Sequence, residues 1–316
     1  MGFSLLRGGC GGFVGGIMTD MLKIARERSV AGRTIGRRAY GCWRFAGSTV
    51  PEAREKVEAA LSIGANLLDT ADIYGFGAEG FGDAELRLGA LLAESPGLRE
   101  EVVLVTKGGV QIPGPYNSRG DYLVSACEAS LSRLGVEAVD IYLVHRPDLL
   151  ASPQEVAAAL SRLLADGKVH SVGVSNYTPG QTRALQAMLD VPLVACQPEI
   201  SLLEPSAFQD GVLDLAQEME AMPMAWSPLG GGRLFNPEDA QSIRVAKALT
   251  TLAEAQETSV DAVALAWLLA HPAGIVPILG SQTPARIRAA AAAYDVKLTG
   301  AEWYALLEAS LGTPMP

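Results

Sequence analysis

The chain has few cysteines, few basic side chains and no long apolar run. Its four cysteines among 316 residues, Cys10, Cys42, Cys127 and Cys196, are widely separated and form no Cys-x-x-Cys pair. This spacing is typical neither of a disulfide framework nor of a metal site, so we expect no metal and four small thiols in a reducing compartment. No run of 18 consecutive apolar residues is present, so we expect no membrane-spanning helix.

Acidic residues outnumber basic ones by 35 to 25, which gives a formal net charge of −10. Such a chain repels a phosphate backbone, so we expect no nucleic acid partner. Residues 1–21 are glycine-rich and lack both an unbroken apolar segment and a cleavage site, so we predict a disordered leader rather than a signal peptide. These features favour a cytoplasmic protein and leave its oligomeric state open.

Strands and helices alternate from residue 22 onward. A short β-hairpin is predicted first, with strands at 23–26 and 33–36 joined through 29–32. The predicted helices include 209–222 and a long stretch that ends at Ala270. Eight apolar strands are predicted, at 40–44, 66–69, 102–107, 139–145, 169–174, 193–197, 224–226 and 276–279.

The alternation predicts an α/β fold, and two architectures fit it. A closed (β/α)₈ TIM barrel repeats the strand–helix unit eight times, but a doubly wound sheet would show the same local pattern. No linker interrupts the chain, so we predict one domain over residues 22–316.

Polar or aromatic side chains stand at the ends of six consecutive predicted strands. Alone, each has a structural interpretation: an ion pair, a loop anchor, a packed histidine or a helix cap. Their arrival in order on successive strands favours one active site at the C-terminal mouth of a barrel. They are Asp69, Lys107, His145, Ser175 with Asn176, Gln197 and Trp226, and Tyr74 follows Asp69 in its loop.

Seven sequence blocks resemble the signatures of the aldo/keto reductase family, in the family's order, over roughly residues 22 to 312. They are Asn66–Gly75 (NLLDTADIYG), Val105–Lys107, Leu143–Pro147, Gly173–Tyr177, Gln197–Glu199, Trp226–Gly230, and Gly280-Ser281 with Arg286. The resemblance implies a reductase that transfers hydride from NADPH to an aldehyde or ketone on a (β/α)₈ barrel. Its substrate would be a small carbonyl compound, which the sequence does not identify.

The resemblance implies a role for each of four side chains, and their chemistry suits those roles. Tyr74 is the proton donor, Lys107 tunes its pKa, Asp69 holds the lysine, and His145 orients the carbonyl. A developing alkoxide needs a proton donor in place. A tyrosine, with a free pKa of about 10, becomes an effective donor when a neighbouring ammonium stabilises its phenolate.

The same resemblance implies a nucleotide site. Ser175, Asn176 and Gln197 would clamp the nicotinamide carboxamide, and Trp226 would stack on its ring. Backbone N–H groups in the glycine-rich loop after the seventh strand would meet the pyrophosphate, and the next helix start would meet the 2′-phosphate, favouring NADPH over NADH. The loop residues are Ser227, Leu229, Gly230 and Arg233, and the helix-start residues are Gly280, Ser281 and Arg286.

The sequence departs from the family pattern at the adenosine end. Gly280 stands where the family often has a basic residue, and Ala289-Ala290 stand where it often has Glu-Asn. These differences predict a weaker grip on that end of the nucleotide. A separate G-x-G-x-x-G match at 75–80 is not a Rossmann fingerprint, since the next strand ends in Lys107 rather than in an acidic residue.

Two alternative functions remain open at the sequence level. A lysine inside a barrel is also suited to a Schiff-base lyase acting through Lys107. A barrel that binds NADPH but turns over little would instead be a redox-sensing regulatory subunit. Arg146, Tyr116, Phe76 and Trp43 are candidates to line the substrate pocket.

Overall fold

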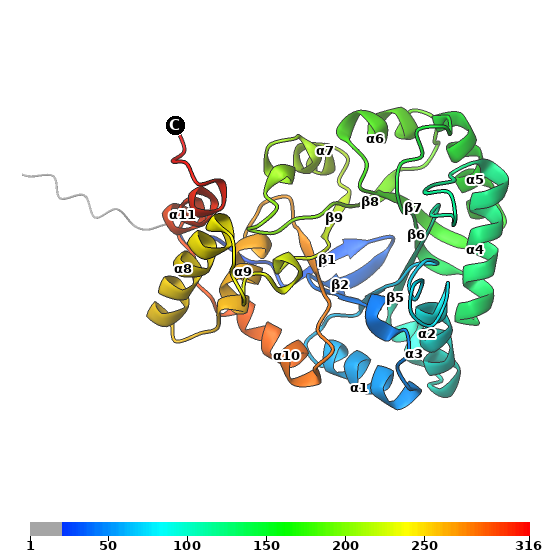
Figure 1. Ribbon diagram of the computed structural model, residues 1–316. Helices are drawn as coiled ribbons and strands as arrows, with labels where there is room; N and C mark the ends of the chain where they lie inside the picture. Colours follow the sequence, from blue (N-terminus) through cyan, green and yellow to red (C-terminus); the bar gives the residue numbers. More distant parts are fainter. Residues whose placement is uncertain (1–20) are drawn as a thin grey trace, which may run out of the picture.

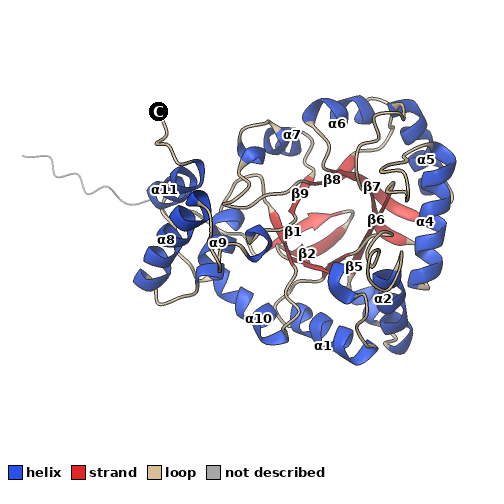
Figure 2. Cartoon of the chain, in the orientation of Figure 1, coloured by secondary structure: helices blue, strands red, loops and turns tan. Residues whose placement is uncertain are grey.

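Eight parallel strands close into a barrel in the computed structural model, which describes residues 21–316. The strand order around the barrel is β10-β3-β4-β5-β6-β7-β8-β9, and the helices surround it as an outer ring (Figures 1 and 2). This confirms the TIM barrel and excludes the doubly wound sheet, because β10 pairs with both β9 and β3. The strands are β3 (Ala39–Gly41), β4 (Leu67–Asp69), β5 (Val103–Gly108), β6 (Val139–Val144), β7 (Val169–Ser175), β8 (Leu193–Gln197), β9 (Met222–Ala225) and β10 (Val276–Leu279).

Helices follow the strands in the expected alternation. Several begin with a Ser, Thr or Asp side chain that caps the first turn, as Ser152 does by accepting a hydrogen bond from the backbone N–H of Glu155. The helices are α1 (Val50–Leu61), α2 (Asp83–Glu94), α3 (Leu98–Glu101), α4 (Gly120–Leu134), α5 (Pro153–Ala165), α6 (Pro179–Gln186), α7 (Val212–Glu218), α8 (Ala240–Ala255), α9 (Val260–Leu269), α10 (Pro284–Ala289) and α11 (Gly300–Leu311), with short 3₁₀ turns η1 (Trp43–Phe45), η2 (Ser206–Phe208), η3 (Gly230–Gly232) and η4 (Ala290–Tyr294).

The two-residue period of the strands decides which side chains enter the barrel. In β5, Val103 and Val105 pack inside the barrel while Leu104 packs outward against the helices. Lys107 continues the inward series at the C-terminal end of the strand. Asp69 follows the inward-facing Leu67 in β4 in the same way. The alternation that builds the apolar interior therefore also directs these charged side chains to the mouth.

The predicted hairpin is present, but its first strand was placed wrongly. The strands are β1 (Glu27–Val30) and β2 (Arg33–Gly36), rather than 23–26 and 33–36. Ala31 and Gly32 both have positive φ, 50° and 71°, which gives a tight two-residue turn whose twist matches the strands. Val30 beside the turn and Ile35 pack into the barrel interior, so the hairpin closes the end opposite the mouth.

Most other predicted strands agree with the structure to within one or two residues at each end, and three further segments differ more widely. The helical stretch ending at Ala270 is two helices, α8 and α9, because Glu257 adopts a positive φ of 51° and Ser259 caps a new helix. The helix predicted at 209–222 is shorter, since Asp210 and the left-handed Gly211 begin it late and Met222 belongs to β9. The strand predicted at 40–44 becomes β3 followed by η1.

Part of the predicted leader, residues 1–20, lies outside the described residues. No helix within residues 21–316 is both long enough and apolar enough to cross a lipid bilayer.

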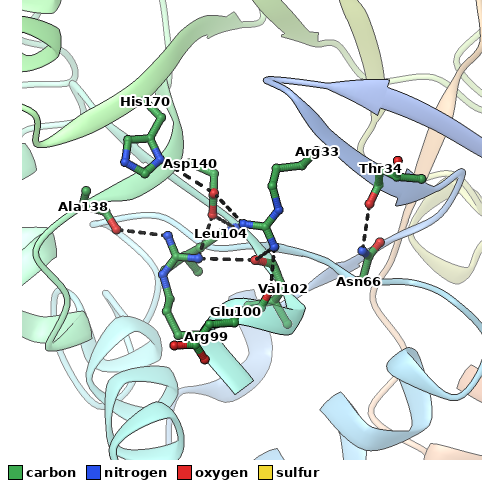
Figure 3. A network of polar contacts seen from close by, with 10 residues as sticks. All are labelled: Arg33, Thr34, Asn66, Arg99, Glu100, Val102, Leu104, Ala138, Asp140 and His170. Carbon is green, nitrogen blue, oxygen red and sulfur yellow. Dashed lines mark hydrogen bonds and ion pairs between the residues drawn. The ribbon is translucent and has the colours of Figure 1, made fainter. Parts of the chain in front are cut away.

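A buried carboxylate ties the hairpin to the barrel at the N-terminal ends of the strands (Figure 3). Asp140 of β6 is 3% exposed and accepts a hydrogen bond from the backbone N–H of Leu104 at 2.8 Å. It pairs with Arg99 at 2.9 Å and with Arg33 of β2 at 3.3 Å, and His170 lies 3.9 Å away. Both guanidinium groups also donate to backbone carbonyls near the start of β5, so one carboxylate links three strands and α3.

Replacing Asp140 with Asn should lower the free energy of unfolding by about 2 kcal/mol, because Arg33 and Arg99 then lose their carboxylate partner, although both guanidinium groups stay partly hydrated. Chemical denaturation followed by circular dichroism measures this. Glu218→Gln is the matched control, since its ion pair with Arg183 is exposed. Equal midpoints for the two variants would show that the Asp140 network contributes no more than a surface pair.

Candidate active site

Lys107 is the centre of the mouth, and all three of its ammonium hydrogens have partners. Its side chain is fully buried, and Nζ lies 2.8 Å from Asp69 Oδ2, 2.8 Å from the carbonyl oxygen of Thr70 and 2.9 Å from the phenol oxygen of Tyr74. A buried ammonium is tolerated only when paired and hydrogen-bonded. Burial lowers the lysine pKa, but Asp69 and Tyr74 outweigh it and raise that pKa, so Lys107 stays charged.

The second oxygen of Asp69 connects the lysine to the far side of the barrel. Asp69 Oδ1 accepts a hydrogen bond from Gln197 Nε2 at 2.8 Å. Gln197 ends β8, which is not a neighbour of β4 in the sheet, so this contact crosses the barrel interior. The carbonyl oxygen of the Gln197 side chain has no hydrogen-bond partner among residues 21–316, which leaves it free to accept from a ligand.

Tyr74 lies on the turn that follows β4. Its backbone N–H donates to the carbonyl of Ala71, and its own carbonyl accepts from Ala84 at the start of α2. Burial raises the pKa of the phenol, while Lys107 opposes that shift. Tyr74 is therefore protonated at neutral pH and has a proton to give.

His145 follows β6 and faces the tyrosine. The two rings meet edge to face with centroids 5.8 Å apart. Burial lowers the histidine pKa well below its usual 6.5, and the charges of Lys107 and Arg146 lower it further. Nδ1 is buried without a hydrogen-bond partner in the described chain, so Nε2 is the ring nitrogen that a ligand can reach on this neutral imidazole.

A second network joins His145 to Trp226. Ser175 Oγ donates to the backbone carbonyl of Gln197 at 2.9 Å. Asn176 has a positive φ of 58°, and its amide nitrogen donates to Ser175 Oγ at 2.8 Å and to the carbonyl of His145 at 3.3 Å. Trp226 Nε1 donates to Asn176 Oδ1 at 2.9 Å. These contacts fix the indole ring at the mouth.

The remaining sequence-predicted residues lie on the next two loops, and none of them is a hydrogen-bond or ion-pair partner of Lys107, Asp69 or the Tyr74 side chain. Ser227, with a positive φ of 49°, leads through Leu229 into Gly230–Gly232, whose φ values of 59°, 65° and 95° only glycine adopts readily. Arg233 is exposed and donates to the carbonyl of Gly230 at 3.4 Å.

The last loop carries Gly280 and Ser281, followed by the exposed Arg286 on α10. This helix has only six residues, so its dipole contributes less to anion binding than the sequence suggested. An anion here would be bound mainly by the Ser281 hydroxyl and the Arg286 guanidinium.

Sequence analysis missed two contributors to this site. The backbone carbonyl of Thr70 is a lysine acceptor, and no side-chain pattern could reveal it. Tyr40 of β3 donates from its hydroxyl to the carbonyl of Ser281 at 3.0 Å, which ties the last loop to the first barrel strand.

Comparisons with known proteins agree on one family. A family model described as the aldo/keto reductase family matches residues 39–310. A 6-dehydroglucose reductase of Novosphingobium aromaticivorans is 49% identical over 294 residues, covering 92% of this chain and 97% of the relative. A 6-dehydroglucose reductase of Agrobacterium fabrum is 39% identical, covering 88% and 95%. The solved glycerol dehydrogenase of Gluconobacter oxydans has a TM-score of 0.77 at 25% identity, covering 95% of this chain and 98% of that one.

Replacing Lys107 with Met should raise the pKa of His145, because one of the two positive charges that depress it is lost. The imidazole resonances in an NMR pH titration, assigned with His145→Gln, measure this shift. Lys168→Met, which removes an exposed ammonium paired with Glu128, should leave the His145 titration unchanged. A His145 pKa that does not rise in Lys107→Met would show that burial alone keeps the imidazole neutral.

Proposed function

This chain belongs to the aldo/keto reductase family, and we propose that it uses NADPH to reduce the aldehyde of 6-dehydroglucose, or of a closely similar sugar-derived carbonyl compound, to the alcohol. The substrate class is carried over from the two 6-dehydroglucose reductases that match nearly the whole chain. The single observation that carries the chemistry is the buried contact of Lys107 Nζ with both Asp69 and the Tyr74 phenol.

The four side chains would divide the reaction among them. His145 would hold the substrate carbonyl by hydrogen bonding from Nε2, close to the phenol that it faces at 5.8 Å between ring centroids. Tyr74 would pass its proton to the carbonyl oxygen as negative charge develops there. Lys107, kept charged by Asp69, would stabilise the phenolate that remains. NADPH, when bound, supplies the hydride that the carbonyl carbon receives.

The residues present fit a nicotinamide nucleotide. The free side-chain oxygen of Gln197 can accept from the NH₂ of a carboxamide, beside Ser175 and Asn176. Trp226, fixed through Asn176, offers an indole face to the ring. The positive-φ glycines of η3 can present backbone N–H groups to the pyrophosphate. Ser281 and Arg286 can bind a 2′-phosphate, which supports NADPH over NADH.

The lysine geometry argues against the lyase alternative. A Schiff-base nucleophile must be a neutral amine with a free lone pair, and such lysines have lowered pKa values. Here the pKa of Lys107 is raised, and all three hydrogens are engaged by protein acceptors.

The described cysteines are free thiols, which suits the reducing cytoplasm proposed for this reductase.

Tyr74→Phe should lower kcat for carbonyl reduction by roughly 10²–10⁴-fold, because the proton donor is lost, and Lys107→Met should do the same. NADPH binding, followed by fluorescence quenching, should persist in both variants. Tyr304→Phe, on the outer face of α11, is the matched control and should retain full activity. Wild-type-like kcat in Tyr74→Phe would overturn the assignment of the proton donor.

Arg286→Ala should weaken NADPH binding by roughly 10- to 150-fold, the worth of a charge-assisted hydrogen bond, and should leave NADH binding unchanged. Fluorescence titration with each nucleotide measures both constants. Arg288→Ala removes an exposed arginine from the same helix and should affect neither. An equal loss for NADPH and NADH would contradict a 2′-phosphate contact at Arg286.

A further inference from the structure

We propose that Arg146 is a specificity-determining residue whose guanidinium binds oxygen substituents next to the substrate carbonyl, so that the site selects oxygenated aldehydes over plain aliphatic ones. The inference rests on the proposed carbonyl reduction and deepens it, since it names the chemical feature by which the substrate is recognised. Nothing in the catalytic steps described above uses this side chain.

The position of Arg146 places it beside the reacting group. It directly follows His145, whose carbonyl accepts a hydrogen bond from Asn176 at 3.3 Å. Its guanidinium carbon lies 5.7 Å from the centre of the Trp226 ring. The side chain is partly buried, so its guanidinium lies near the indole of the proposed nicotinamide site on the residue next to the proposed carbonyl-orienting histidine.

The guanidinium has its donors free for a ligand. Within residues 21–316 no hydrogen bond or ion pair engages the Arg146 side chain, whereas Arg99 and Arg133 are both bound to carboxylates. The cation–π contact with Trp226 orients the planar group without using its N–H bonds. Five N–H donors in a fixed fork suit two neighbouring oxygens, as the hydroxyl and ring oxygens of a sugar present.

The surrounding charges favour an uncharged, oxygen-rich substrate over an anion. Burial, and after it the neighbouring Glu204, raise the pKa of the Glu199 carboxyl. The positive charges of Arg233 and Arg146 lie close enough to oppose that rise. No ion pair within 4.0 Å joins Arg146 to Glu199 or Glu204. The negative charges of these two glutamates nevertheless balance the positive charges of the two arginines nearby. Lys107 is already matched by Asp69. The mouth thus offers hydrogen-bond donors without a net positive charge.

Selectivity follows from the cost of leaving these donors unpaired. A site built to bind a substrate oxygen rejects an analogue that lacks it more strongly than an apolar pocket rejects a missing methylene. A hydrogen bond to a charged group corresponds to roughly a 10- to 150-fold difference. Arg146 should therefore contribute that factor to oxygenated aldehydes and almost nothing to aldehydes with an alkyl chain.

The test compares D-glyceraldehyde with propanal, which has the same three-carbon chain without hydroxyl groups, at saturating NADPH. Arg146→Met, which keeps length but removes charge and donors, should lower kcat/KM for D-glyceraldehyde roughly 10- to 150-fold and for propanal less than about threefold. Arg146→Lys should recover part of the loss. Arg162→Met, an exposed helix residue, is the control and should change neither substrate.

Two results in this comparison would overturn the inference. An equal loss for both aldehydes would mean that Arg146 acts through His145 or Trp226, and no loss for either would mean that it binds no substrate oxygen. Failure of the proposed function is distinguishable, because the wild type would then reduce neither aldehyde with NADPH. In that case the inference is decided by titrating the NADP⁺-saturated protein with D-glucose and following its tryptophan fluorescence. Binding of D-glucose that is at least tenfold weaker in Arg146→Met than in the wild type supports the inference. A wild type that does not respond to D-glucose, or equal binding by the two proteins, overturns it.

Discussion

A single buried ammonium constrains the rest of the barrel mouth. Transferring a lysine charge into a dry interior costs several kcal/mol unless an opposite charge and hydrogen-bond acceptors meet it. Asp69 supplies the charge, and Thr70 and Tyr74 complete the three acceptors. All three acceptors come from the end of β4 and its loop, so the conformation of that loop is tied to the strand pairing between β4 and β5.

This constraint extends across the barrel through hydrogen bonds rather than through apolar packing. Asp69 binds Gln197 on the opposite strand, and the backbone carbonyl of Gln197 accepts from Ser175. Asn176 then joins Ser175, His145 and Trp226. The proton-donor side and the proposed nucleotide side are therefore parts of one connected network of hydrogen bonds.

The two ends of the barrel use buried charge for different purposes. At the closed end, Asp140 pairs with two arginines from the hairpin and α3, and both of its carboxylate oxygens have protein partners. At the mouth, the Nε2 atom of His145, the side-chain oxygen of Gln197 and the guanidinium of Arg146 are left for a ligand. Complete pairing is suited to stability, and incomplete pairing is suited to binding.

The sequence by itself determined the β/α alternation, the residues at the strand ends and the family, because apolar periodicity and residue order are local properties of the chain. It could not separate a closed barrel from an open sheet, since that choice depends on β10 pairing with β3, where Ile278 lies beside Ala39, 239 positions earlier in the chain. Only the tertiary structure decided that Gln197 lies next to Asp69 and that the helical stretch is interrupted at Glu257. It also decided that burial, which raises the pKa of Tyr74, outweighs the opposing effect of Lys107. These properties arise from the surroundings that distant segments create together, and no local pattern encodes them.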